Sequence, residues 1–367
     1  MKEFGEAILK FGVFSDTHIT EDESWHTNRY FRQGLALLKN VAPDANCICC
    51  CGDLTQWGKP AQLGNFLSIL KSEYDLTQTP FIFCSGNHDN FVNHYDKAGL
   101  AQFEERIKEG LGAESYSRDI ATGPNLSRHV VVNGVHFICL NVENYVLPGD
   151  AYSPEMLLWF EAEMKKAAAA SLDMPIMVFS HIQISNTIAG SDFYTAVYPL
   201  LLLHSNQLRP ILAKYPQAIY FSGHLHYSNN GDSSIAQQGF AAVNCPPLDY
   251  LCTDFGFYQM KGGLDCIFEE AKLHPACMLV EVNAKGETRI TNLDILSGEK
   301  CNEPWLISPL QPGKYGQNRR NEIAPPRFEC CDLEAEICGG ELALSFSAAS
   351  SESQVSTTRL NLCAGKI

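Results

Sequence analysis

The chain has 367 residues, a formal net charge of -15 and a sequence pI near 5.2. A protein that follows a nucleic-acid backbone needs many lysines and arginines, so this acidic balance disfavours a nucleic-acid partner. The length suggests two domains, although single α/β domains of roughly 250 to 300 residues are common. We expect no membrane span, because no window is long and apolar enough, and residues 1–10 do not resemble a signal peptide.

The 15 cysteines could be taken for a disulfide scaffold. Several of them lie in apolar runs that read as strands, where adjacent residues point to opposite faces and therefore pack rather than pair. These are Cys47, Cys49, Cys50, Cys51, Cys84 and Cys139. The odd number of cysteines also favours reduced thiols, so we expect a cytoplasmic protein.

Strand-like and helix-like segments alternate along the first third of the chain. We expect strands at residues 9–14, 47–51 and 80–84, and helices at residues 28–40, 60–72 and 97–111. This alternation is typical of βαβ units. Residues 176–179 and 218–221 read as two further buried strands.

Antiparallel hairpins follow the alternating region. Asn133 and Gly134 separate the apolar runs 128–132 and 135–140, which predicts a type I′ turn and a second sheet. Another hairpin is expected from residues 278–282 and 288–293. We therefore expect an α/β protein in which two mixed β-sheets pack face to face with helices outside.

From about residue 311 the composition changes to proline, glycine and serine. We therefore predict one domain over residues 1–310 and an appendage over residues 311–367. The appendage is either strand-bearing, with candidate strands at residues 341–346 and 357–362, or partly disordered.

Five short polar segments each follow an expected strand, and ligands of open α/β sheets bind at that edge. The segments are Asp16-Thr17-His18, Gly52-Asp53, Gly86-Asn87-His88-Asp89, Ser180-His181 and Gly223-His224-Leu225-His226. Taken singly, an Asp or His at a strand end is more often a hydrogen-bonded structural group than a ligand. Together the five segments favour a metal site.

The donors in these segments are carboxylates, an amide oxygen and imidazoles, a set that suits Mn, Fe or Zn. Asp16 and His18 are two residues apart at a strand end, so both side chains can reach one ion. His224 and His226 repeat this spacing. Asp53 can offer one carboxylate oxygen to each of two ions, and is therefore the natural bridging ligand.

The five segments resemble the signature of the calcineurin-like metallophosphoesterases, D-x-H, GD, GNH[D/E], H and GHxH, and the resemblance covers roughly residues 9–295. It implies a four-layer α/β/β/α sandwich of two mixed β-sheets, the metallo-dependent phosphatase fold. It also implies two metal ions. The first would be held by Asp16, His18, Asp53 and His226, and the second by Asp53, Asn87, His181 and His224.

The resemblance leaves His88 uncoordinated and facing the substrate. A hydroxide that bridges two ions about 4 Å apart would attack phosphorus. His88 is the best candidate to stabilise the transition state or to protonate the leaving oxygen, and Asp89 is the candidate to orient it. Among the other histidines, His129 and His136 read as strand residues, His274 as a loop residue, and His26 and His94 as possible pocket residues, while His204 has no assigned role.

Two branches of the family are disfavoured by the residues after Asp53. Protein serine/threonine phosphatases carry a D-R-G element there, whereas this chain has Leu-Thr-Gln-Trp at residues 54–57. Purple acid phosphatases place a metal-binding tyrosine where this chain has Gln56. The motifs resemble the branch that contains cyclic-nucleotide and glycerophosphodiester phosphodiesterases, so a small phosphodiester is the expected substrate.

Three alternatives remain open at this stage: a phosphomonoesterase, a non-catalytic scaffold of the same fold, and a DNA-processing nuclease. The complete ligand set disfavours the scaffold, and the acidic composition disfavours the nuclease. The segment of about forty residues between His181 and Gly223 is expected to cap the pocket and set specificity. The oligomeric state is left open.

Overall fold

The computed structural model describes residues 4–93, 97–116, 118–145, 150–192, 199–229, 231–253, 256–257, 275–308 and 315–316, and four short stretches after residue 326. The chain divides into two compact units, Met1–Gly316 and Gln317–Ile367. In the described residues, no helix is long and apolar enough to cross a membrane.

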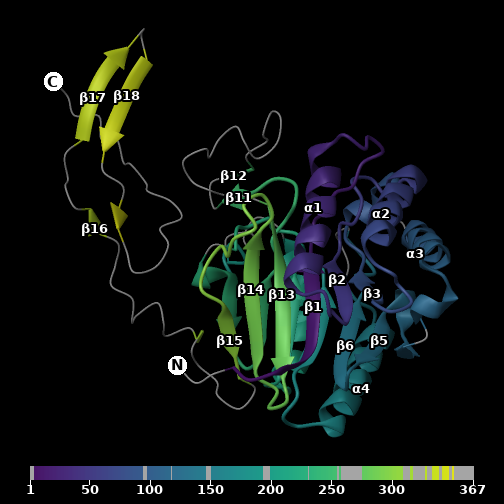
Figure 1. Cartoon of the computed structure of the whole chain (residues 1–367). Coiled ribbons are helices and arrows are strands. Elements are labelled where there is room, and N and C mark those ends of the chain that lie inside the picture. Colours follow the sequence, from purple (N-terminus) through teal and green to yellow (C-terminus); the bar gives the residue numbers. More distant parts are fainter. Residues whose placement is uncertain are drawn as a thin grey trace. The chain divides into compact units, whose positions relative to one another are not determined.

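One of the two large sheets of the larger unit is a six-stranded mixed sheet, with strands from both ends of this unit's sequence (Figure 1). Its strands, in spatial order, are β15 (Trp305–Ile307), β14 (Thr288–Asp294), β13 (Ala276–Asn283), β1 (Ala7–Phe14), β2 (Cys47–Cys51) and β3 (Phe81–Cys84). Strands β1, β2 and β3 run parallel, and β13 to β15 are antiparallel. Every residue of β2 and β3 is buried, as expected for parallel strands covered on both faces.

The other large sheet is a seven-stranded mixed sheet. Its order is β4 (Asp119–Thr122), β5 (Arg128–Val132), β6 (Val135–Leu140), β7 (Ile176–Ser180), β8 (Ala218–Ser222), β10 (Ala241–Asn244) and β9 (Ile235–Gln237). Asn133 and Gly134 have φ values of 48° and 80°, so both adopt the left-handed conformation that a type I′ turn requires. The predicted hairpin in a second sheet is confirmed.

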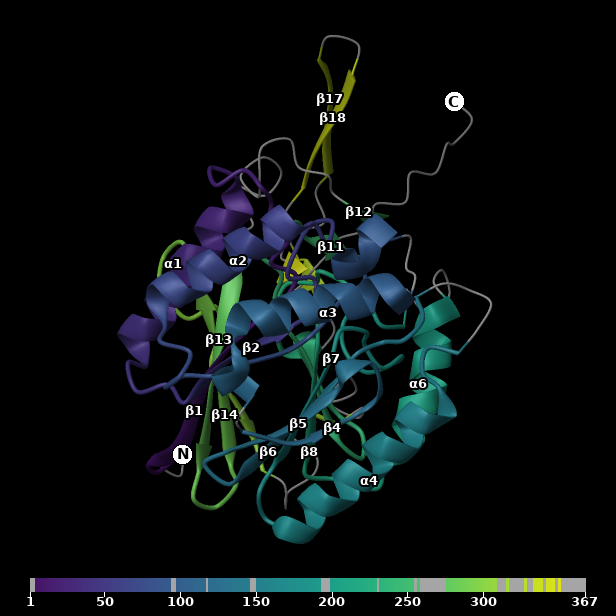
Figure 2. The ribbon, with the colours of Figure 1, turned by 90° about the vertical axis from the view of Figure 1, so that its right-hand side faces the viewer.

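Helices cover the outer face of each sheet (Figure 2). Helices α1 (His26–Val41), α2 (Pro60–Glu73) and α3 (Lys97–Leu111) pack on the six-stranded sheet, and α4 (Pro154–Ala170) and α6 (Pro199–Leu212) on the seven-stranded sheet. Proline at the first position favours the start of α4, and the Ser153 hydroxyl accepts a hydrogen bond from the Met156 amide at 3.2 Å. The predicted four-layer α/β/β/α sandwich is confirmed.

Short elements complete the larger unit. They are the 3₁₀ helices η1 (His88–Asn93), η2 (Ala113–Tyr116), η3 (Pro124–Leu126) and η4 (Asp232–Ser234), and the strand pair β11 (Cys252–Thr253) and β12 (Gly256–Phe257). In the second unit, β16 (Arg327–Phe328) pairs with β19 (Ala349–Ser350), and β17 (Leu333–Cys338) pairs with β18 (Glu341–Phe346). The strand predicted at 341–346 is present, and the one predicted at 357–362 lies outside the described residues.

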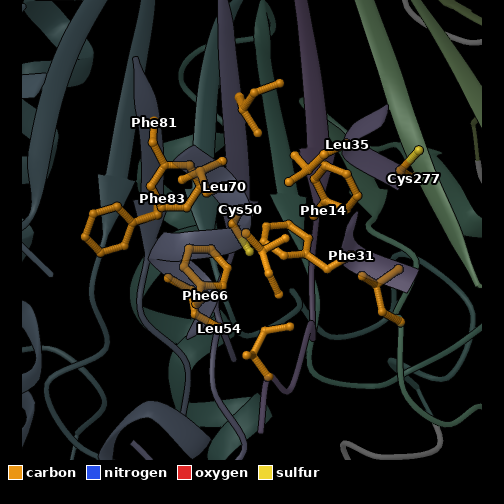
Figure 3. Close-up of a cluster of buried hydrophobic side chains, with 14 of the residues drawn as sticks. Phe14, Phe31, Leu35, Cys50, Leu54, Phe66, Leu70, Phe81, Phe83 and Cys277 are labelled. Atoms are coloured by element: carbon orange, nitrogen blue, oxygen red, sulfur yellow. The ribbon is translucent and has the colours of Figure 1, made fainter. Parts of the chain in front are cut away.

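Aromatic rings fill the layer between the two sheets and the layers beneath the helices. Phe11 of β1 meets Phe137 of β6 edge to face, with 5.1 Å between ring centroids. On the other face of the first sheet, Phe31 and Phe66 stack at 4.8 Å in the cluster shown in Figure 3. Burial of this apolar area on both faces of each sheet is the main stabilising contribution to the fold.

The cysteines of β2 alternate between these layers, as the sequence predicts. Cys50 points into the cluster beneath the helices, whereas Cys47, Cys49 and Cys51 point into the layer between the sheets. In the part of the larger unit that the structure describes, the ten cysteines are all free thiols.

The segment between His181 and Gly223, which is expected to cap the pocket, is not a continuous loop. It contains α6, whose Leu208 and Leu212 are buried against the seven-stranded sheet. Residues 193–198 of this segment lie outside the described residues.

Candidate metal centre

Five loops meet where β1, β2, β3, β7 and β8 end. Parallel pairing holds the ends of β1, β2 and β3 level with one another, and likewise the ends of β7 and β8. The loops are joined by backbone hydrogen bonds, from the Asp16 amide to the Gly52 carbonyl and from the Gly223 amide to the His181 carbonyl, each 3.1 Å long. The Leu248 amide, after β10, donates to the Asp16 carbonyl at 3.2 Å and so links the two sheets.

One group of donor atoms comprises side chains of Asp16, His18, Asp53 and His226, all buried and within 4.8 Å of one another. Nε2 of His226 lies 3.1 Å from Oδ1 of Asp16 and 3.3 Å from Nε2 of His18. Two imidazole nitrogens and two carboxylates that converge in this way offer the donor types that hold a shared cation. The sequence prediction for the first ion named these same four residues.

The second group comprises Asp53, His181 and His224, again within 4.8 Å. Oδ1 of Asn87 lies 3.2 Å from Nε2 of His181 and 3.0 Å from Nδ1 of His224, so the amide oxygen belongs to the same group. Oδ2 of Asp53 lies 3.1 Å from Nε2 of His181 and 3.8 Å from Nε2 of His18. Asp53 therefore belongs to both groups, which is the position of a bridging carboxylate.

Backbone carbonyls fix the orientation of two imidazoles. Nδ1 of His181 donates to the Cys51 carbonyl at 2.7 Å, and Nδ1 of His226 donates to the Tyr250 carbonyl at 2.9 Å. A carbonyl can only accept, so the proton resides on Nδ1 and the lone pair of Nε2 is directed into the cluster. This arrangement fits a metal ligand, whose second ring nitrogen is usually held by such a partner.

The backbone of the cluster is strained. Nine residues other than glycine have a positive φ in the described part of the chain, and five of them are Asp16, His18, Asp53, His224 and His226. This conformation is uncommon outside glycine, and it persists where the surrounding structure holds a functional side chain in place. The strain thus coincides with the candidate ligands.

Burial and mutual charge set the protonation of the donors. Burial alone would raise the pKa of Asp16, but the imidazoles of His226 and His181 outweigh it and bring the pKa to about 2. Burial disfavours a charged His181, yet Asp53 and Asp16 raise its pKa to about 9. Burial and the neighbouring His88 lower the pKa of His18 to about 4. Ionised carboxylates and a neutral His18 are the forms that coordinate a metal, whereas His181 must release a proton to do so.

The glycines of the motifs make room for the carboxylates. A Cβ on Gly86 would overlap with the Asp53 carboxylate oxygen and amide nitrogen, and a Cβ on Gly223 would overlap with Ser15 and with the Asp16 carboxylate. Glycine is required at both positions because the carboxylates approach the backbone this closely.

We expect Gly86→Ala to displace Asp53 and to weaken metal binding. The overlap should also lower the stability by about 1 to 3 kcal/mol, which is a fall in Tm of several degrees. Gly64→Ala in α2 is the matched control, because a Cβ there meets nothing within 4 Å and should stabilise the helix slightly. Thermal melts and metal titrations of the two variants test this, and equal behaviour of both would contradict it.

The two predicted catalytic residues occupy different positions. The His88 ring lies 4.5 Å from the His18 ring, centroid to centroid, and its Nδ1 donates to the Gln56 carbonyl at 2.9 Å. Its amide donates to Oδ1 of Asp53 at 2.8 Å. His88 is therefore placed beside the cluster, with its Nδ1 and its amide both held by neighbouring oxygens.

Asp89 is buried beneath the loops. Its carboxylate accepts hydrogen bonds from the amides of Leu54, Thr55 and Gly86, at 3.2, 2.9 and 2.9 Å. Burial, with the charge of Asp53 added, raises its pKa to about 7. These contacts join the loop after β2 to the loop after β3, and that Asp89 also orients His88 stays a prediction.

Three contributors to the site are not evident from the sequence. The Tyr250 ring stacks on the His226 ring at 3.9 Å, and Asp249 pairs with Nε2 of His26 at 2.9 Å. The Ser15 hydroxyl donates to Oδ2 of Asp16 at 2.6 Å. In the sequence, residues 249–250 belong to a Pro-Leu-Asp-Tyr stretch after β10. Nothing in a single sequence identifies this stretch as part of a metal site.

The remaining histidines lie elsewhere or outside the described residues. His129 lies in β5 and His136 in β6, so both are strand residues as predicted. His129 bonds to Glu163 at 2.7 Å and to His136 at 2.8 Å. His204 bonds to the Tyr220 hydroxyl at 2.8 Å. His94 and His274 are outside the described residues.

Residues 9–228, more than half of the chain, match the model of the calcineurin-like phosphoesterase family, so the chain belongs to this family. The match confirms the family predicted from the motifs. The Asp and His groups described above form a candidate dinuclear centre.

The chain is similar to solved structures at low sequence identity, and the first of them shares its fold. A purple acid phosphatase from yellow lupin (Lupinus luteus) seeds aligns with a TM-score of 0.56 and 12% identity, over 82% of this chain and 53% of the lupin chain. GAP50, the anchor in the inner membrane complex of Plasmodium, aligns with a TM-score of 0.48 and 13% identity, over 85% of this chain and 91% of its own. The chain thus spans about half of the length of the lupin enzyme. Among curated proteins, none matches the chain.

Proposed function

We propose that the chain hydrolyses a small phosphodiester at a dinuclear metal centre. Asp16, His18, Asp53 and His226 would hold one ion, and Asp53, Asn87, His181 and His224 the other. The observation that carries the proposal is the position of Asp53, whose Oδ2 lies 3.1 Å from His181 and 3.8 Å from His18.

Two bound ions would supply a nucleophile at neutral pH and neutralise charge on the phosphoryl oxygens. The carboxylate, amide and imidazole donors suit Mn, Fe or Zn. His88 would donate a proton from Nε2 to the leaving oxygen, since its Nδ1 is engaged by the Gln56 carbonyl. The same carbonyl holds the ring in one orientation, which reduces the ordering required in the transition state.

The charges of the site favour a diester over a monoester. A phosphomonoester carries up to two negative charges near neutral pH, and a diester carries one. Asp16, Asp53 and Asp249 surround the imidazoles, and in the described residues no lysine or arginine pairs with these three carboxylates. With these carboxylates paired to the two ions, the second charge of a monoester would depend on the ions alone, which supports the singly charged ester.

The proposal is tested by hydrolysis of bis(p-nitrophenyl) phosphate and p-nitrophenyl phosphate with metal-stripped protein resupplied with Mn. We expect faster cleavage of the diester. Faster cleavage of the monoester would make the protein a phosphomonoesterase, and the absence of metal-dependent turnover on either ester would favour a non-catalytic scaffold.

We also propose that the larger unit is the catalytic domain and that the remainder, from about residue 311, is an appendage. All nine predicted site residues belong to the larger unit. The free thiols of the described cysteines support a reducing compartment such as the cytoplasm. Alkylation of the thiols in intact cells, followed by mass spectrometry, tests this, and disulfide-linked peptides would argue against it.

A further inference from the structure

An exposed tryptophan stands beside the substrate-facing histidine. Trp57 follows Gln56 in the loop after β2, and its side chain is 38% exposed. Its ring centroid lies 6.0 Å from that of His88, which in turn lies 4.5 Å from that of His18. If His88 protonates the leaving oxygen, the organic group attached to that oxygen is therefore within reach of the indole ring.

The loop that carries Trp57 is anchored on both sides of this residue. The Trp57 amide donates to Oε1 of Gln62 in α2 at 2.8 Å, and the Gly58 amide donates to the Thr55 hydroxyl at 3.0 Å. Nε2 of Gln62 donates to Glu21 at 2.5 Å. The backbone beneath the indole is therefore fixed before a substrate arrives, which lowers the entropy cost of using the ring as a contact surface.

Solvent exposure of an indole this large leaves apolar area that a flat ligand can cover. Exposed tryptophans elsewhere on a surface are ordinary, and Trp25, 47% exposed, is one with no ring contact to His88 among the described residues. The feature that distinguishes Trp57 is its contact with the group expected to protonate the leaving oxygen. A planar ring stacks on an indole better than a puckered ring of equal size.

We propose that Trp57 is a specificity-determining residue that stacks on a planar ring of the leaving group. The preferred substrates are then phosphoesters whose leaving alcohol carries an aromatic ring, such as a nucleobase. This inference rests on the proposed function and deepens it, because it separates ring-bearing esters from aliphatic ones such as glycerol esters.

The test compares benzyl and cyclohexylmethyl esters, which have the same number of carbon atoms but differ in flatness, each as the methyl phosphodiester and as the phosphomonoester. Trp57→Leu should lower kcat/KM for the benzyl esters by roughly tenfold, as loss of a stacking platform does, and change the cyclohexylmethyl esters little. Trp57→Phe should keep most of the preference, and Trp25→Leu all of it. The diester should release benzyl alcohol rather than methanol.

Binding provides a readout that does not depend on turnover. Calorimetry of the metal-loaded protein with benzylphosphonate and cyclohexylmethylphosphonate should show tighter binding of the flat ligand, and Trp57→Leu should remove the difference. If Trp57→Leu changes kcat/KM and binding equally for the benzyl and the cyclohexylmethyl compounds, the inference about Trp57 is overturned. The proposed hydrolase function would still stand. Selective binding of the flat phosphonate without turnover of any ester would support the inference and overturn the proposed function.

Discussion

Replacement of Asp53 by alanine is expected to release both metal ions and abolish hydrolysis. The carboxylate lies between the two groups of imidazoles, so its loss leaves each ion short of a ligand. Loss of a residue that merely supports a ligand typically costs about 10- to 100-fold in metal affinity or activity, and loss of a shared ligand should cost more. Metal analysis and kcat of the purified variant measure the effect.

Asp44→Ala provides the matched control for Asp53→Ala. Asp44 is a carboxylate on the surface that pairs with Lys10 at 2.7 Å and is 64% exposed. An exposed pair of this kind contributes little to stability, so the control should keep both metal content and turnover. Two ions retained by Asp53→Ala would show that this carboxylate does not bridge them.

His88→Ala should keep both ions and lose most of the turnover. The His88 ring contacts the cluster from outside, and the four-residue groups described above do not include it. Loss of a general acid typically lowers the rate by about 10²- to 10⁴-fold. Metal content and kcat on bis(p-nitrophenyl) phosphate separate binding from chemistry in this variant.

His136→Ala is the control for His88→Ala, because His136 bonds to His129 in the second sheet, away from the candidate ligands. It should leave turnover unchanged. If His88→Ala loses metal as well as turnover, His88 is a ligand and its role as an acid is wrong.

The sequence is sufficient to predict those elements whose apolar runs are continuous. Residues 47–51 are predicted as a strand and form β2 with the same bounds, because every position there is buried. Helix α1 begins at His26, two residues before the predicted start, since its N-cap, Trp25, provides no capping side chain that could mark the boundary. Helix α6 was missed because its leucine run and internal Pro210 obscure the helical period.

The candidate ligands are also predictable, because each is a polar side chain directly after a buried strand. Their supporting contacts are not, since the carbonyls of Cys51, Gln56 and Tyr250 belong to the backbone, which every residue shares. Which loop each carbonyl meets depends on how the two sheets pack. The contacts of Asp89 with the amides of Leu54 and Thr55 cannot be predicted either, because these amides also belong to the backbone.

The measurement that tests the dinuclear hydrolase most directly is a titration of metal-stripped protein with Mn, followed by the rate of bis(p-nitrophenyl) phosphate cleavage. The account predicts no cleavage without metal and a rate that saturates at two ions per chain. Saturation at one ion would contradict the bridging role of Asp53, and a rate independent of metal would contradict the assignment of the cluster as the catalytic centre.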